Sequence, residues 1–162
     1  MLRIVVALAA AAIAAHPGGS DRAMAMVTVA AGAHAGSFLV RNTDSPCEIT
    51  EQKAPRPKHR FEALIGGVTP KTDANTLTLL MLIIPDADVR GPMHSFYASI
   101  RFGTVGHDTE YRTETRPGEK AGGSGTVTLV PHGQDATVML DVTSADGVSY
   151  TGTIQCSGVT HY

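Results

Sequence analysis

The sequence contains no tryptophan, only two cysteines and little net charge, and these shortages limit the classes of function that the chain can have. The 162 residues carry a formal net charge of −2, so the chain lacks the broad basic surface that nucleic-acid binding usually requires. No apolar run reaches the length of about 20 residues that a membrane-spanning helix needs. Beyond the amino-terminal segment there is no amphipathic helical pattern, so we expect a fold built from strands.

Sequence motifs for catalysis are also missing. Residues 122–125 (GGSG) do not match the Gly-x-Ser-x-Gly elbow of serine hydrolases and lack the Lys-Ser/Thr ending of a phosphate loop. Residues 86–91 resemble the opening of a calcium loop, but Arg90 occupies a ligand position and Tyr97 replaces the bidentate glutamate. We therefore expect a protein that is not an enzyme, with no catalytic residues and no cofactor.

The amino terminus has the pattern of an export signal. Arg3 supplies a positive charge, and Ile4 to Ala15 is an unbroken apolar run of the kind found in the core of a signal peptide. The pattern predicts a bacterial protein that is secreted or held in the cell envelope. The mature chain is expected to have no transmembrane helix.

Two small-residue patterns could mark the cleavage site, at residues 23–25 (AMA) and at residues 33–35 (AHA). We expect residues 1–25 to be the signal peptide, with cleavage at Ala35 as the alternative, and residues 36–162 to form a single domain. A later translation start, at one of the methionines near residue 25, is a further alternative.

The two cysteines, Cys47 and Cys156, lie near the two ends of the expected domain. Two cysteines in an exported chain most often pair, because the compartment is oxidising. Cys156 falls on the apolar face of its expected strand, whereas a catalytic thiolate needs basic and partly exposed surroundings. We expect a structural disulfide between them.

Alternation of apolar and polar residues between Gly125 and Ser157 predicts three consecutive antiparallel strands. Turn residues separate them at 131–135 and 144–147, and Pro131 is expected to end the pairing of the first strand. Further short strands are expected at 37–41, 47–50, 61–65, 75–84, 95–103 and 110–116.

About eight short strands with regular turns predict an all-β fold, an antiparallel β-sandwich closed by one disulfide, with a small β-barrel as the alternative. Residues 75–84 are apolar on both faces, which suits a central strand. Residues 110–116 alternate charged side chains with tyrosine and threonine, which suits an edge strand.

Two sets of side chains are candidates for binding an external partner. Residues 53–60 contain two prolines and four basic residues, and they could meet an anionic glycan or lipid headgroup or could simply be a solvated connection. The second set is a pair of strand tyrosines that could form an exposed stacking surface for a ligand or could be ordinary strand residues. The residues concerned are Lys53, Arg56, Lys58 and Arg60 in the first set and Tyr97 and Tyr111 in the second.

A metal site is a third candidate. No two histidines of the expected domain are close enough in sequence for a local ligand pair, so loops would have to bring them together. The residues in question are His94, His107 and His132. The alternative, with no metal bound, is that these histidines are exposed turn residues.

Residues 152–157 (GTIQCS), a first cysteine after a short strand, and glycine- and threonine-rich strands resemble the mycobacterial 19-kDa-antigen type of small exported β-sandwich. The resemblance covers mainly the two cysteine neighbourhoods, and the chain lacks the lipidated cysteine of that family. It implies a non-catalytic envelope protein. Our leading expectation is a non-enzymatic binding module whose partner is a protein, glycan or lipid at the cell surface. The alternatives are a carrier of a small apolar ligand, lined by residues 75–84, and a histidine-based metal-binding protein.

Overall fold

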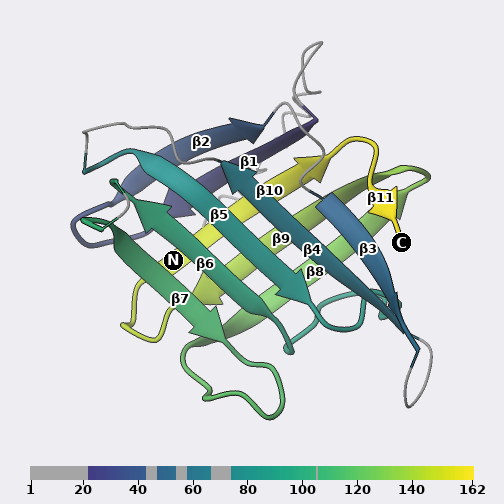
Figure 1. Cartoon of the computed structure of the whole chain (residues 1–162). Coiled ribbons are helices and arrows are strands. Elements are labelled where there is room, and N and C mark those ends of the chain that lie inside the picture. Colours follow the sequence, from purple (N-terminus) through teal and green to yellow (C-terminus); the bar gives the residue numbers. More distant parts are fainter. Residues whose placement is uncertain (1–21, 43–46, 54–57, 67–73, 105) are drawn as a thin grey trace, which may run out of the picture.

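The computed structural model describes residues 22–42, 47–53, 58–66, 74–104 and 106–162 (Figure 1). These residues form strands and turns and contain no helix. The strands are β1 (Ala23–Val29), β2 (Gly36–Asn42), β3 (Cys47–Gln52), β4 (Lys58–Gly66), β5 (Leu77–Ile84), β6 (Tyr97–Phe102), β7 (Thr109–Glu114), β8 (Ser124–His132), β9 (Asp135–Thr143), β10 (Ser149–Cys156) and β11 (Thr160–His161).

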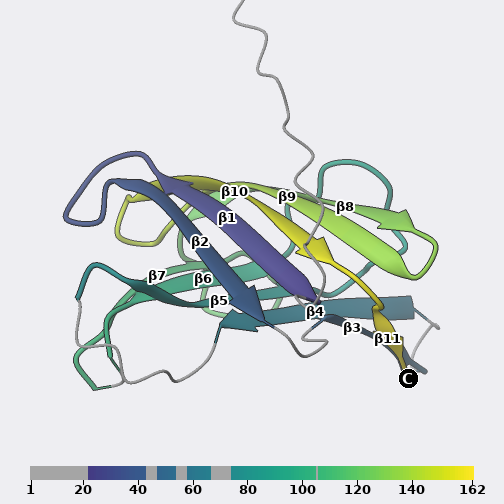
Figure 2. The same ribbon diagram turned by 90° about the horizontal axis from the view of Figure 1, so that it is seen from above.

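The strands form two sheets that stack as two layers (Figure 2). The five-stranded sheet has the order β2-β1-β10-β9-β8, and the six-stranded sheet has the order β11-β3-β4-β5-β6-β7. All pairings are antiparallel except that of β11 with β3. In Figure 1 the strands of one sheet cross those of the other at a steep angle, which is the orthogonal class of sheet packing. The expected sandwich is confirmed, and the sheets do not close into a barrel.

The core lies between the layers and comes from alternate residues of both sheets. Val138, Leu140 and Val142 of β9 point into it, while Thr137, Met139 and Asp141 point outward, as the alternation predicted. The largest fully buried apolar side chains are Tyr150, Phe61, Phe96, Phe102, Ile65, Leu80, Leu82, Ile84, Ile100, Ile154 and Val27.

The expected disulfide joins the two layers. Cys47 of β3 and Cys156 of β10 are bonded and are 1% and 2% exposed, within the core. The bond closes a loop with a sequence separation of 109 residues. It ties one sheet to the other at the corner where the chain leaves β10 for β11.

The structure corrects the expected start of the domain, because β1 lies inside the five-stranded sheet. It pairs with β2 on one side and with β10 on the other, and its inward residues have almost no exposed surface. Cleavage after Ala25 would cut this strand, and cleavage after Ala35 would remove it. The domain therefore includes residues from Arg22 onward, and residues 1–21 of the expected signal lie outside the described residues.

The structure also corrects the expected role of Pro131, which lies within β8 and opposite Ala136. A proline is tolerated there because β8 is the edge strand of its sheet. The hairpin turns instead at Gly133, whose φ of 69° is the left-handed value that the first position of a type II′ turn requires.

Candidate functional site

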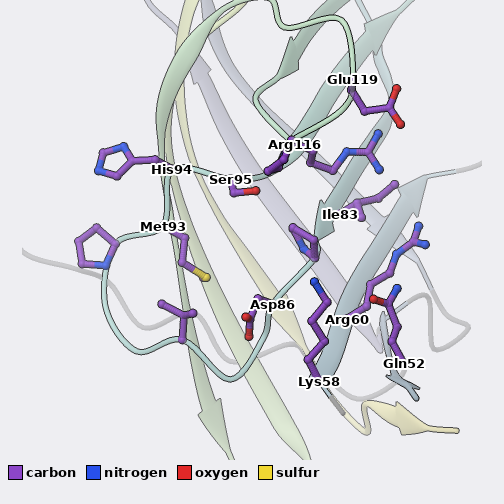
Figure 3. Close-up of a pocket in the computed structure, with 14 residues that line it drawn as sticks. Gln52, Lys58, Arg60, Ile83, Asp86, Met93, His94, Ser95, Arg116 and Glu119 are labelled. Atoms are coloured by element: carbon purple, nitrogen blue, oxygen red, sulfur yellow. The ribbon is translucent and has the colours of Figure 1, made fainter. Parts of the chain in front are cut away.

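A pocket of about 630 Å³ lies at one end of the six-stranded sheet, a volume typical of small-molecule sites (Figure 3). Its wall combines β4, the end of β5, the connection between β5 and β6, and the first residues after β7. The lining residues are Gln52, Lys58, Arg60, Ile83, Pro85, Asp86, Val89, Pro92, Met93, His94, Ser95, Arg116, Pro117 and Glu119.

The connection from Pro85 to Phe96 is fixed to both sheets, so it forms a defined wall. Near its start, the backbone N–H of Ala87 donates to the carbonyl of His59 at 2.7 Å. Near its end, Met93 and Val127 of β8 exchange two backbone hydrogen bonds of 2.7 and 3.0 Å. The segment thus reaches from the six-stranded sheet to the edge strand of the other sheet.

Asp88 fastens the same wall to β4. Its carboxylate accepts hydrogen bonds from the backbone N–H of His59 at 3.1 Å and from Nδ1 of that imidazole at 2.8 Å. The hydrogen bond from the His59 side chain is the main cause that lowers the pKa of Asp88. Both side chains are about half exposed, so the interaction orients the loop more than it stabilises the fold.

One side of the pocket carries basic groups from β4. Lys58 and Arg60 are two residues apart on a strand, so they share a face. Among the described residues Lys58 has no ion-pair or hydrogen-bond partner. Arg60 pairs with Glu62 through Nη2, but its Nε is buried without an acceptor in the described part of the chain.

The opposite side carries Arg116, which Glu114 holds in place. The Glu114 carboxylate is 2% exposed and accepts from Nε of Arg116 at 2.8 Å and from Nη2 at 2.7 Å. These hydrogen bonds hold the pKa of Glu114 below its usual range and raise that of Arg116. The guanidinium groups of Arg112 and Arg116 lie 5.2 and 5.4 Å from the ring centroid of Tyr97. Arg116 is therefore a fixed charge rather than a mobile one.

The basic segment that the sequence singled out is divided by the structure. Lys53 is exposed outside the pocket, Arg56 lies outside the described residues, and Lys58 and Arg60 belong to β4. The last two line the pocket together with Arg116, which lies on its opposite side and which the sequence gave no reason to group with them.

Tyr97 and Tyr111, the two candidates for a stacking surface, do not share a face. The two rings lie on opposite faces of the six-stranded sheet and are 9% and 7% exposed. Tyr97 is covered by the arginines of β7 and its continuation, while Tyr111 points inward, where its hydroxyl bonds to His34 at 2.8 Å.

The three histidines of the metal hypothesis are not brought together. His94 is in the pocket wall, where its Nδ1 donates to the carbonyl of Gly125 at 3.1 Å. His107 lies in the β6–β7 turn, and His132 ends β8. Across the described ranges, no three His, Cys, Asp or Glu side chains form a group that could hold a metal ion.

The buried histidine that the sequence did not identify is His34, which had been assigned to the signal region. It stacks on Phe102 with ring centroids 4.3 Å apart, and its Nε2 donates to the carbonyl of Ala74 at 3.1 Å. Its Nδ1 faces Tyr111, so both ring nitrogens are used in joining the β1–β2 loop to the six-stranded sheet. It is a packing residue, since its ring is 7% exposed.

The inward side chains of β5 are not arranged around a ligand cavity. Leu80, Leu82 and Ile84 pack in the core between the sheets with no more than 1% exposure. Ile83, on the other face of the strand, lines the pocket. Residues 77–84 therefore contribute packing inside and an apolar floor outside.

No match is found among protein-family models, curated proteins or solved structures. In the part of the chain that the structure describes, no helix is long and apolar enough to cross a membrane.

Proposed function

We propose that this protein is a non-enzymatic binding protein that acts outside the cytoplasm, and that its pocket takes a small organic anion with an apolar part. The observation that carries the proposal is the pocket wall formed by β4. It presents the Lys58 ammonium, which has no acceptor among the described residues, beside the guanidinium of Arg60.

A ligand carboxylate, sulfonate or phosphate would supply an acceptor for the Lys58 ammonium, and a hydrogen bond between charged groups is stronger than one between neutral groups. Ile83, Val89 and Met93 of the wall offer apolar contact for the rest of the ligand. Most small-molecule sites combine an apolar surface with a few polar groups that fix orientation in this way.

The charge of the lining favours a ligand of low charge. Lys58, Arg60 and Arg116 are opposed by Asp86 and Glu119, so the side chains that line the pocket sum to a single positive charge. A ligand with one negative charge neutralises this net charge, whereas a polyanion would be repelled by the two carboxylates.

The buried disulfide supports a location in an oxidising compartment, because cytosolic thiols are usually kept reduced. Export also agrees with the apolar segment Ile4–Ala15. A cleavage site compatible with the five-stranded sheet has to precede Arg22, since β1 starts directly after that residue. The resemblance to small exported sandwich proteins around the two cysteines points in the same direction.

The test uses 8-anilinonaphthalene-1-sulfonate, a dye that combines an apolar ring system with one sulfonate. We expect the dye to bind at one site and Lys58→Gln to weaken binding about tenfold, because a hydrogen bond to a charged group contributes roughly 1.5–3 kcal/mol. The matched control is Lys53→Gln, which removes the same charge from an exposed residue that does not line the pocket. Dye binding that is absent, or equal in the two variants, would contradict the proposal.

A further inference from the structure

The outer face of the five-stranded sheet is almost without charge. Its central row crosses all five strands at Leu39, Met26, Thr153, Met139 and Thr128, which the register places side by side. We call this row and the two rows beside it the uncharged face. In the two flanking rows all but two of the outward residues are methionine, valine, threonine, serine or glutamine.

The two exceptions are Arg41 and Asp141. Arg41 lies on β2 in the row of Met24, and Asp141 lies on β9 in the row of Thr28. They have opposite signs and stand at diagonally opposed parts of the uncharged face.

The other sheet shows that this composition is not a property of the fold. Its outward positions are rich in charge, including Arg60, Glu62, Arg101, Glu110, Arg112 and Glu114. The two sheets are the two layers of one small protein, as Figure 2 shows, but only the outer face of the six-stranded sheet is rich in charge.

Apolar side chains in the central row of the uncharged face are half exposed. Met26 and Met139 are 49% exposed and Leu39 is 47% exposed, so the fold itself does not bury them. Depletion of charge together with methionine enrichment is the composition of the buried centre of protein interfaces. A contiguous exposed apolar patch commonly marks such a surface.

We propose that the uncharged face binds the same face of a second copy of this chain. A twofold axis lying in the interface, through the midpoint between Arg41 and Asp141, places Arg41 of each copy over Asp141 of the other. That midpoint falls between Met26 and Thr153, in the central row. The apolar residues then meet near the axis, and Arg41 of one copy faces Asp141 of the other at the rim.

The geometry of this arrangement agrees with known sheet packing. Asp141 is three strands and two rows away from Arg41, which is about 14 Å across the sheet and about 14 Å along the strands. The axis therefore runs at about 45° to the strands, and the strands of the two copies cross at about 90°, one of the two preferred angles for stacked sheets.

The area is sufficient for a reversible dimer. Five strands and three rows cover about 500 Å² of each copy, so the dimer buries at most about 1,000 Å² in total, since Met24 in the row of Arg41 is already only 6% exposed. That value is at the lower limit for a specific interface, so we expect monomer and dimer to be in equilibrium at micromolar concentrations.

The test is sedimentation velocity of the full chain, secreted so that the disulfide forms, between about 5 µM and 1 mM. We expect the average mass to rise from that of one chain towards that of two. Met26→Lys should weaken association at least tenfold, because it places a charge at the centre of the interface. The matched control is Leu64→Lys, which changes a side chain of the same 49% exposure on the charged sheet and should leave association unchanged.

A charge exchange separates a second copy from any other occupant. Asp141→Arg alone should weaken association, and Asp141→Arg combined with Arg41→Asp should restore it, because each new arginine meets a new aspartate across the axis. A monomer at every concentration, an equal effect of Met26→Lys and Leu64→Lys, or a failure of the double variant to recover would each overturn the proposal.

Discussion

Removing the disulfide between Cys47 and Cys156 is expected to cost the protein a large part of its stability. The bond closes a loop with a separation of 109 residues, for which the lost loop-closure entropy of the unfolded chain corresponds to about 4.7 kcal/mol. A domain of this size has a total stability of about 5–15 kcal/mol, so the loss approaches or exceeds half of it in many cases.

The double variant Cys47→Ala with Cys156→Ala adds a packing loss to the entropy term. Both residues are buried in the core at 1% and 2% exposure, so each removed sulfur leaves a small void that costs roughly 1 kcal/mol. The expected total is about 6–7 kcal/mol for the variant and about 4.7 kcal/mol for the reduced wild type. An unfolding entropy of about 0.3 kcal/mol/K converts the latter value into a decrease in Tm of about 15 °C.

Equilibrium unfolding in urea, followed by far-UV circular dichroism because the chain has no tryptophan, measures these differences. Dithiothreitol gives the reduced wild type, which keeps both sulfur atoms and isolates the entropy term. The m-value should rise on reduction, because the unfolded chain expands and exposes more surface. A loss below about 2 kcal/mol, or an unchanged m-value, would refute the reasoning from loop closure.

Two further substitutions test buried polar groups. Glu114→Gln should destabilise the fold by about 2 kcal/mol at pH 7, since the carboxylate forms charge-assisted bonds to Arg116. Its lowered pKa means that this stability is present above the unfolded-state pKa of roughly 4.3 and is lost as the pH falls through the folded value. The acid unfolding profiles of variant and wild type should therefore converge as the pH falls through the folded pKa, and parallel profiles would contradict this. Tyr150→Phe should change stability by less than about 1 kcal/mol, because the buried hydroxyl, whose pKa is raised by desolvation, lies beside the Thr113 hydroxyl but forms no hydrogen bond of good geometry among the described residues. Thermal unfolding checks this, and a loss above about 1 kcal/mol would contradict it.

Much of the fold could be predicted from the sequence, because apolar and polar residues alternate along several strands and the apolar ones are buried. The inward and outward residues of β8, β9 and β10 alternate as predicted, and those of β7 do so up to Glu114, whereas β6 is buried on both faces. β1 has Ala23, Ala25 and Val27 inward, but these small residues also fit the pattern of a signal-peptide cleavage site, so its strand pattern is ambiguous in the sequence. β1 is nevertheless an interior strand, because it lies between β2 and β10.

The candidate site was less predictable, because it depends on contacts between distant parts of the chain. Pairing of Met93 with Val127 carries the wall of the pocket across to the other sheet, and no local pattern records that pairing. Alternation correctly placed Tyr97 on the outward face, but it could not show that Arg112 and Arg116 cover the ring. The exposure of a strand residue depends on the face to which it points and also on the length of the side chains beside it on the neighbouring strands.

The position of β1 between β2 and β10 has a consequence for the order of assembly. Strands β3 to β7 pair with their sequence neighbours and can form as soon as they are made. The five-stranded sheet, in contrast, joins one of the first strands of the chain to the last long one, and such distant pairings are slow to form. The five-stranded sheet therefore stays incomplete until the carboxyl-terminal residues have been made, so half of the molecule cannot close over the core before then.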